Sequence, residues 1–185
     1  MHDTRAHIVE ALSKLVSLPL AIARDAASMK NFQFGLIRPH SSGTGTVGEY
    51  ALHIQCPWRL VREGGILTGS ADFYEPAEAN KEVDLRDWRA GNLQRKRLGE
   101  VLRSFDDATR SWVNGTGELV VASVAADDLG GFELVLSGGF RLQVFPCGSR
   151  GEDWRFFDPG GDGPHLVVDG GRISAPSVAS SSEDK

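Results

Sequence analysis

The sequence predicts an α+β protein made of two similar units, each a helix followed by antiparallel strands, that together form one mainly antiparallel sheet assembly. Three observations predict this class. Most apolar residues alternate with polar ones, only two segments place apolar residues at helical spacing, and the order of helix then strands occurs once in each half. Because domains commonly run to ~100–200 residues, we expect one domain over 1–174, with pseudo-repeats at about 4–74 and 92–172.

Two helices are expected. Asp3 or Thr4 can cap the first and Asn92 the second, because each side chain can accept a hydrogen bond from the first helical turn. The apolar residues at helical spacing are Ile8, Leu12 and Leu15 in the first helix and Leu98, Val101, Leu102 and Phe105 in the second. The run Gln94–Arg97 predicts a solvated helix face.

The stretch Gly48–Tyr74 predicts a β-hairpin with a turn at Glu63-Gly64-Gly65. Its first strand is expected to run unbroken from Tyr50 to Val61. The face toward the core would carry Tyr50, Leu52, Ile54, Cys56, Trp58 and Leu60, which share one parity. The opposite face would carry polar residues, among them His53, Gln55 and Arg59.

The remaining strands are expected on the same grounds of alternation and β-propensity. They are 20–24, 32–36, 118–125, a second hairpin at 132–145, and two last strands at 154–157 and 165–168. Residues 75–91 are expected to form a polar connector. The tail 175–185 has no apolar content to bury, so we expect it to be disordered.

The two halves resemble each other. After 100 is subtracted, Leu119–Leu136 aligns without a gap to Pro19–Leu36, which matches Phe32 with Phe132 and Leu36 with Leu136. The next strands match at an offset of 90, and Trp58-Arg59-Leu60 matches Trp154-Arg155-Phe156 at 96. We predict an internal duplication with a pseudo-two-fold axis, the alternative being chance similarity between amphipathic strand pairs. The groove between the units would be the natural binding place.

Charge and hydropathy limit the partners and the compartment. The net charge of −5 and the pI of about 5.5 disfavour nucleic acid and anionic membranes, which need a cationic surface, and favour a basic partner. The N-terminal segment lacks the features of a secretory signal, and no stretch approaches the ~18 consecutive apolar residues of a membrane span. We therefore expect a cytoplasmic protein.

Motifs for catalysis or metal binding are weak. Cys56 and Cys147 are too few for a disulfide scaffold, so both are expected to be buried free thiols. His53 and Cys56, with Cys147 and His165 downstream, are residue types that bind zinc, but positions three apart on a strand face opposite sides, so His53 and Cys56 would bind one ion only if Pro57 marks a bulge. The literal G-x-G-x-x-G at Gly43–Gly48 precedes a strand instead of a helix, which indicates a flexible loop. We expect no cofactor, no metal and no catalytic residue.

Several segments, once placed on these elements, resemble a group of uncharacterised small bacterial proteins of unknown function. The segments are Leu18-Pro19-Leu20, Phe32-Gln33-Phe34-Gly35, Gly48 to Leu60, Val144-Phe145-Pro146 and Trp154-Arg155-Phe156. The similarity covers roughly residues 9–171. It implies no activity, cofactor or site residue, and the further analogy to immunity or regulatory partners of toxins rests on size and acidity alone.

The sequence therefore predicts a non-catalytic binding or interaction module, immunity-like or regulatory, with a protein partner or a second copy of itself. The alternative is a small-molecule binding protein or enzyme with a pocket between the halves, lined by Trp58, Arg59, Trp154 and Arg155. The candidate binding residues are His53, Gln55, Trp58, Arg59, Arg141, Gln143, Trp154 and Arg155.

Overall fold

The structure is a computed structural model that describes most of the chain. The described residues are 3–41, 43, 45–79, 81–82, 91–102, 104–106, 109, 111–113 and 119–174. The predicted disordered tail 175–185 lies outside them, as does much of the predicted connector 75–91.

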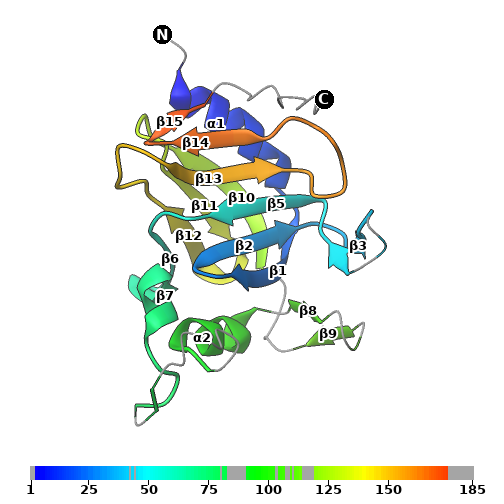
Figure 1. Ribbon diagram of the computed structural model, residues 1–185, viewed down its shortest axis with the longest axis vertical. Helices are drawn as coiled ribbons and strands as arrows, with labels where there is room; N and C mark the ends of the chain where they lie inside the picture. The colour runs from blue at the N-terminus through cyan, green and yellow to red at the C-terminus, as the bar shows by residue number, and fades with distance from the viewer. Residues whose placement is uncertain are drawn as a thin grey trace, which may run out of the picture.

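An antiparallel sheet dominates the fold (Figure 1), which confirms the α+β class. Eleven strands are hydrogen-bonded in the order β15-β14-β13-β5-β2-β1-β10-β11-β12-β6-β7. We call the strands on the β1 side the first wing: β1 (Pro19–Ala26), β2 (Met29–Phe34), β5 (Tyr50–Ile54), β13 (Glu152–Phe157), β14 (Leu166–Asp169) and β15 (Arg172–Ile173). The second wing consists of β10 (Leu119–Ala126), β11 (Phe132–Leu136), β12 (Phe140–Val144), β6 (Trp58–Arg62) and β7 (Gly65–Gly69).

The two wings meet along a short seam. β1 and β10 pair only where Pro19 and Leu20 lie opposite Val120 and Leu119. Beyond this point each strand has a register shift against its hairpin partner, and such bulges bend a strand. The sheet folds over at the seam, so that β2, β5 and β13 lie in front of β10, β11 and β12 in Figure 1. The wings therefore face each other across one core.

Aromatic side chains from opposite wings meet in this core. The rings of Phe32 and Trp58 lie 5.2 Å apart, and those of Phe132 and Trp154 lie 4.9 Å apart, both edge to face. Each pair joins one wing to the other, because Phe32 and Trp154 belong to the first wing and Trp58 and Phe132 to the second. One hydrophobic cluster includes buried residues of both wings and both helices.

The prediction of one unbroken strand over Tyr50–Val61 is wrong, because this segment forms two strands. β5 ends at Ile54 in the first wing, and β6 begins at Trp58 in the second. Pro57 has no N–H to donate to a ladder, and the N–H groups of Gln55 and Cys56 both bond to Asp153 O. The predicted parity holds across the break, because both strands turn the same parity of residues toward the shared core.

Both predicted hairpin turns are confirmed, but the return strand of the first hairpin ends at Gly69, because Ser70–Tyr74 forms the short helix η2 instead of the predicted strand. β6 and β7 are joined at the predicted turn, where Glu63 and Gly64 have φ of 55° and 78°. β11 and β12 are joined by the short helix η3 (Ser137–Gly139). The remaining strands are the pairs β3 (Arg38–Pro39) with β4 (Thr46–Val47) and β8 (Ser104–Asp106) with β9 (Ser111–Val113).

Both predicted helices form, with the predicted caps, but the second ends at Val101, so Phe105, predicted as part of its apolar stripe, belongs to β8. α1 (Thr4–Leu12) is capped by Asp3, whose Oδ1 accepts from Ala6 N at 3.0 Å, and α2 (Leu93–Val101) is capped by Asn92, whose Oδ1 accepts from Arg95 N at 2.8 Å. The short helices η1 (Ser13–Leu15) and η2 (Ser70–Tyr74) complete the helical elements. The buried side chains among the predicted apolar residues are Ile8, Leu12, Leu15, Leu98 and Leu102. Within the part of the chain that the structure describes, no helix is long and apolar enough to cross a membrane.

Candidate binding site

The candidate residues do not form one face. The structure separates them into two polar rows, one on each wing, each running across three neighbouring strands. On the second wing Glu133, Gln143 and Arg59 lie opposite one another on β11, β12 and β6. On the first wing the row on β2, β5 and β13 consists of Asn31, His53 and Arg155.

The second-wing row is a continuous chain of hydrogen bonds. Arg59 Nε donates to Gln143 Oε1 at 2.6 Å, and Gln143 Nε2 donates to Glu133 Oε2 at 2.5 Å. The Arg59 guanidinium also lies over the ring of Phe145, 5.3 Å from its centroid, and Phe145 is an exposed hydrophobic residue. These contacts fix the guanidinium while its two Nη atoms have no hydrogen-bond partner among the described residues.

A hollow of about 320 Å³ lies over this row, and we call it the Arg59 groove. It is lined by Arg59, Ala125, Ala126, Asp127, Gly131, Phe132, Glu133, Gln143, Val144 and Phe145. Two carboxylates and one guanidinium give the lining a net negative charge, with two phenylalanines and two alanines beside them. The β10–β11 loop forms one side, because Asp127 Oδ1 accepts from Leu129 N and Gly131 N, both at 2.8 Å.

The first-wing row differs because its arginine already has a carboxylate. Arg155 donates from Nε to Glu152 Oε1 at 2.6 Å and from Nη2 to Glu152 Oε2, and this bonding lowers the pKa of Glu152. Gln55 Nε2 also donates to Glu152 Oε1, at 3.1 Å. Partial burial, together with the neighbouring Arg155 charge, lowers the pKa of His53, which favours a neutral imidazole. The His53 ring meets Phe157 edge to face at 4.7 Å.

Two candidate residues belong to the core. Trp58 is 3% exposed and Trp154 is fully buried, with its indole N–H donating to Gly130 O at 2.8 Å. This corrects the expectation that both indoles line a pocket between the halves, because the core fills the space between the wings. Arg141 is exposed on β12, opposite Val61 of β6, and lies outside the hydrogen-bonded row.

The cysteines differ from one another. Cys56 is buried, as expected, and burial raises the pKa of its thiol to about 12, so the thiolate is strongly disfavoured. Cys147 is exposed, which corrects its predicted burial. No group of three or more His, Cys, Asp or Glu residues that could hold a metal ion occurs in the described parts of the chain.

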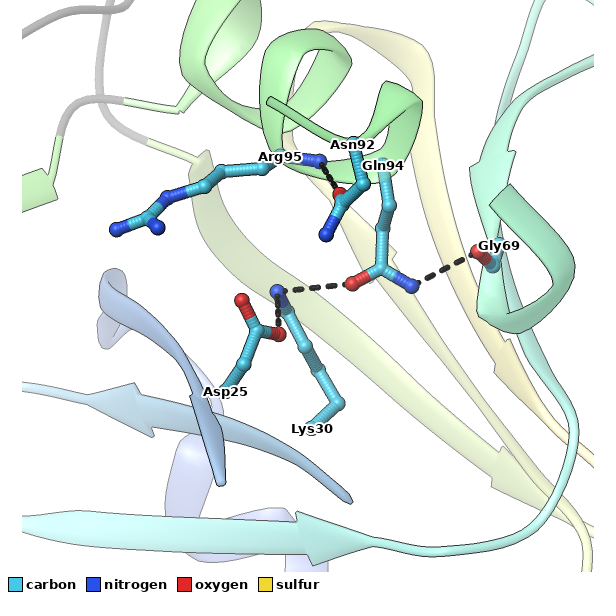
Figure 2. Close-up of polar contacts among 6 residues, drawn as sticks. All are labelled: Asp25, Lys30, Gly69, Asn92, Gln94 and Arg95. Carbon is cyan, nitrogen blue, oxygen red and sulfur yellow. Dashed lines mark hydrogen bonds and ion pairs between the residues drawn. The ribbon is translucent and has the colours of Figure 1, made fainter. Parts of the chain in front are cut away.

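Sequence reasoning missed a second polar cluster, which Figure 2 shows between β1, β2 and α2. Lys30 is 2% exposed, and its Nζ donates to Asp25 Oδ1 at 2.7 Å and to Gln94 Oε1 at 3.1 Å. Gln94 Nε2 in turn donates to Gly69 O at 2.9 Å, at the end of β7. The cluster connects the β1–β2 hairpin of the first wing to α2 and to the edge strand of the second wing.

Burial of Gln94 corrects its assignment to a solvated helix face. The sequence did contain a signal for the cluster: Lys30 shares the parity of Phe32 and Phe34, both buried, so it occupies a core position of β2. Burial lowers the pKa of Lys30, while Asp25 favours its charged form. Because its ammonium is enclosed by its own partners, we assign Lys30 to the architecture and not to a binding surface.

Comparison with known proteins adds no family assignment. A scan against protein-family models, a search of curated proteins and a search of solved structures each found no match to this chain. The resemblance to uncharacterised bacterial proteins therefore stays a prediction.

Proposed function

We propose that this protein is a non-catalytic binding module that captures a protein partner in the cytoplasm, in an immunity-like or regulatory role, through the Arg59 groove. One observation carries the proposal: the bonded row Glu133-Gln143-Arg59 holds a charged and an aromatic side chain in fixed positions beside an open hollow. Arginine and aromatic residues whose geometry is fixed before binding lose little entropy when a partner docks, and they dominate interface energies.

The contrast between the two rows supports this choice. Arg59 and Arg155 each follow a buried tryptophan, at the same place in their wings. Arg155 is already paired with the Glu152 carboxylate, two residues before Trp154. The residue two before Trp58 is Cys56, which has no carboxylate to pair with Arg59. The Nη donors of Arg59 are thus available to a carbonyl or carboxylate of a partner.

We also propose that the chain is an internal duplication in which the halves exchange a strand. The order β1-β2-β5 outward from the seam in the first wing corresponds to the order β10-β11-β12 in the second wing. The fourth strand of each wing comes from the other half of the chain: β13 in the first wing and β6 in the second. Both β1 and β10 have a register shift just after the seam. The same crossing in both wings supports a duplication over chance similarity of amphipathic strands.

The strand register supports an alignment that differs from the gap-free one by two residues. Leu52 and Leu142 correspond at an offset of 90, and they lie opposite Phe32 and Leu134 respectively. Phe32 therefore corresponds to Leu134 instead of Phe132. Accordingly, Leu36 is 75% exposed, although the gap-free alignment would match it with the buried Leu136. The β10–β11 loop is longer than the β1–β2 loop, which contributes to this difference.

The experiment that tests the binding function is capture of partners from native cell extract by immobilised protein, with Arg59→Ala compared with wild type. We expect capture to fall at least about tenfold, because a buried interface arginine commonly contributes about 2 kcal/mol or more. The melting temperature should change little, because Arg59 is only partly buried.

Arg155→Ala is the matched control. It removes the corresponding arginine of the first wing, which is already paired with Glu152, so capture should persist. Equal capture by wild type and Arg59→Ala would refute the groove as the binding site, and collapse of the Arg59→Ala fold would show that this residue is structural.

A further inference from the structure

We propose that an extended, basic polypeptide segment binds as an added strand along the free edge of β10, at Val124–Ala126. The inference rests on the proposed binding function and names its partner chemistry. β10 pairs with β11 on one side, whereas on the other side β1 reaches only Leu119 and Val120. The backbone of Val121 bonds to residues 17 and 18, and beyond it no described residue pairs with this edge.

The outward backbone groups can be assigned by parity. Asp127 N–H points inward, toward Gly131 O in the β10–β11 loop. Because inward and outward groups alternate along a strand, the N–H and C=O groups of Val124 and Ala126 point away from β11. They form a ladder edge ready for another strand, the usual basis of recognition by strand addition.

Two hollows flank this edge, one on each face of the sheet. The Arg59 groove lies on the outer face, where Ala125 is opposite Glu133. A second hollow, of about 580 Å³, lies between β10 and the N-terminal half of α1, and it is lined by Asp3, Arg5, Ala6, Val9, Glu10, Val124, Ala125 and Ala126. Side chains of an added strand alternate between the faces of the sheet, so they would enter the two hollows in turn.

The hollows suit a strand because the side chains next to the β10 backbone are small, whereas those farther from it are polar. Ala6, Ala125 and Ala126 leave room for close approach of a second backbone. On the first wing β8 packs against the matching strand β1, and on the second wing α1 packs against β10. The hollow between α1 and β10 is the space that remains for an occupant.

Charge selects the occupant. Asp3 and Glu10 in one hollow and Asp127 and Glu133 in the other outnumber Arg5 and Arg59. A segment with lysine or arginine at alternate positions would place its charges beside these carboxylates. A second copy paired edge to edge would instead bring like-charged carboxylates together, in a chain whose net charge is already −5.

The test uses the full chain and two blocked octapeptides, one alternating lysine with valine and one alternating glutamate with valine. We expect the lysine peptide to bind at least tenfold more tightly than the glutamate peptide in isothermal titration at low salt. Hydrogen exchange followed by NMR should show new protection at the amides of Val124 and Ala126 but not at Ala125, whose N–H already faces β11. Equal affinity of the two peptides, or no new protection at Val124 and Ala126, would overturn the proposal.

Two lysine peptides that are N-methylated on alternate amide sets provide a geometric check. Strand addition uses only one set of amides, so one methylated peptide should lose binding and the other should keep it. If both bind like the parent peptide, the segment does not join the sheet. Protection of Val124 and Ala126 that grows with the concentration of the protein alone would identify a second copy as the occupant and would also overturn the proposal.

Charge variants separate this inference from the groove. The double variant Glu10→Gln with Glu133→Gln should bind the lysine peptide at least about fivefold more weakly than wild type. The control is the double variant Glu63→Gln with Glu78→Gln, which removes exposed carboxylates elsewhere and should keep the wild-type affinity. Weakening by both double variants alike would leave only a net-charge effect and refute the site. If the lysine peptide does not bind while Arg59→Ala still abolishes partner capture, the edge proposal is wrong and the proposed binding function is retained.

Discussion

At the scale of single residues, the least expected feature is an ion pair inside a small protein. The side chains of Lys30 and Asp25 are 2% and 5% exposed, and they lie opposite each other at the end of the β1–β2 hairpin. In the β10–β11 hairpin the last pair, Ala126 and Phe132, is uncharged. In the first hairpin the ion pair is also bonded to α2, because Lys30 Nζ donates to Gln94 Oε1.

Replacing Lys30 with Met should destabilise the protein by about 3–5 kcal/mol, because the Asp25 carboxylate would stay buried without its partner. The double variant Lys30→Met with Asp25→Ala should recover at least half of this loss, since neither charge then remains. Urea denaturation measures both free energies. Lys81→Met is the control, because Lys81 forms an exposed pair with Glu78 and should contribute under about 1 kcal/mol. A double variant as unstable as the single one would show that packing, not the unpaired charge, causes the loss.

At the scale of elements, the hairpin turns decide the register. The β6–β7 turn has Glu63 and Gly64, both at positive φ, between the paired residues Arg62 and Gly65. This is the backbone of a two-residue hairpin turn that favours Asn-Gly. The glutamate is strained there, because a side chain with Cβ seldom adopts this conformation.

Glu63→Asn should therefore stabilise the protein by about 0.5–1 kcal/mol, because asparagine tolerates the left-handed region better than glutamate. Thermal unfolding followed by circular dichroism checks this. Glu75→Asn is the matched control, since Glu75 is also exposed but has an ordinary φ of −97°. A loss of stability in Glu63→Asn would mean that the exposed contact between Glu63 and Arg62 outweighs the strain.

At the scale of the whole molecule, the exchange of β6 and β13 links the halves. β5 pairs with β13 of the second half, and β12 pairs with β6 of the first half. A half on its own would expose the edge of a central strand and the core face beneath it. Neither half should therefore be an independent folding unit.

We expect fragments 1–82 and 91–185 to remain unfolded when produced separately and to form a native-like complex when mixed. Two-dimensional NMR of each fragment and of the mixture tests this. The intact chain should unfold in a single cooperative urea transition. Well-dispersed spectra from either fragment alone would contradict the shared core.

The sequence by itself determined the local features: the α+β class, both helix caps, the β6–β7 and β11–β12 turns, and the parity of residues toward the core. These depend on neighbours a few residues apart, so alternation, cap residues and turn glycines suffice to predict them. It also named Arg59 and Gln143, which the structure joins in one bonded row.

Only the tertiary structure decided the rest. The break at Pro57, the exchange of β6 and β13, the burial of Trp154, and the Lys30 cluster depend on contacts between residues far apart in the chain. An alternating pattern states which face of a strand is apolar, but it does not state which strand lies beside it. For this reason His53 and Arg59, on one predicted strand, lie in different wings. The pairing partner is set by the shared core, in which both wings must bury their apolar faces at once.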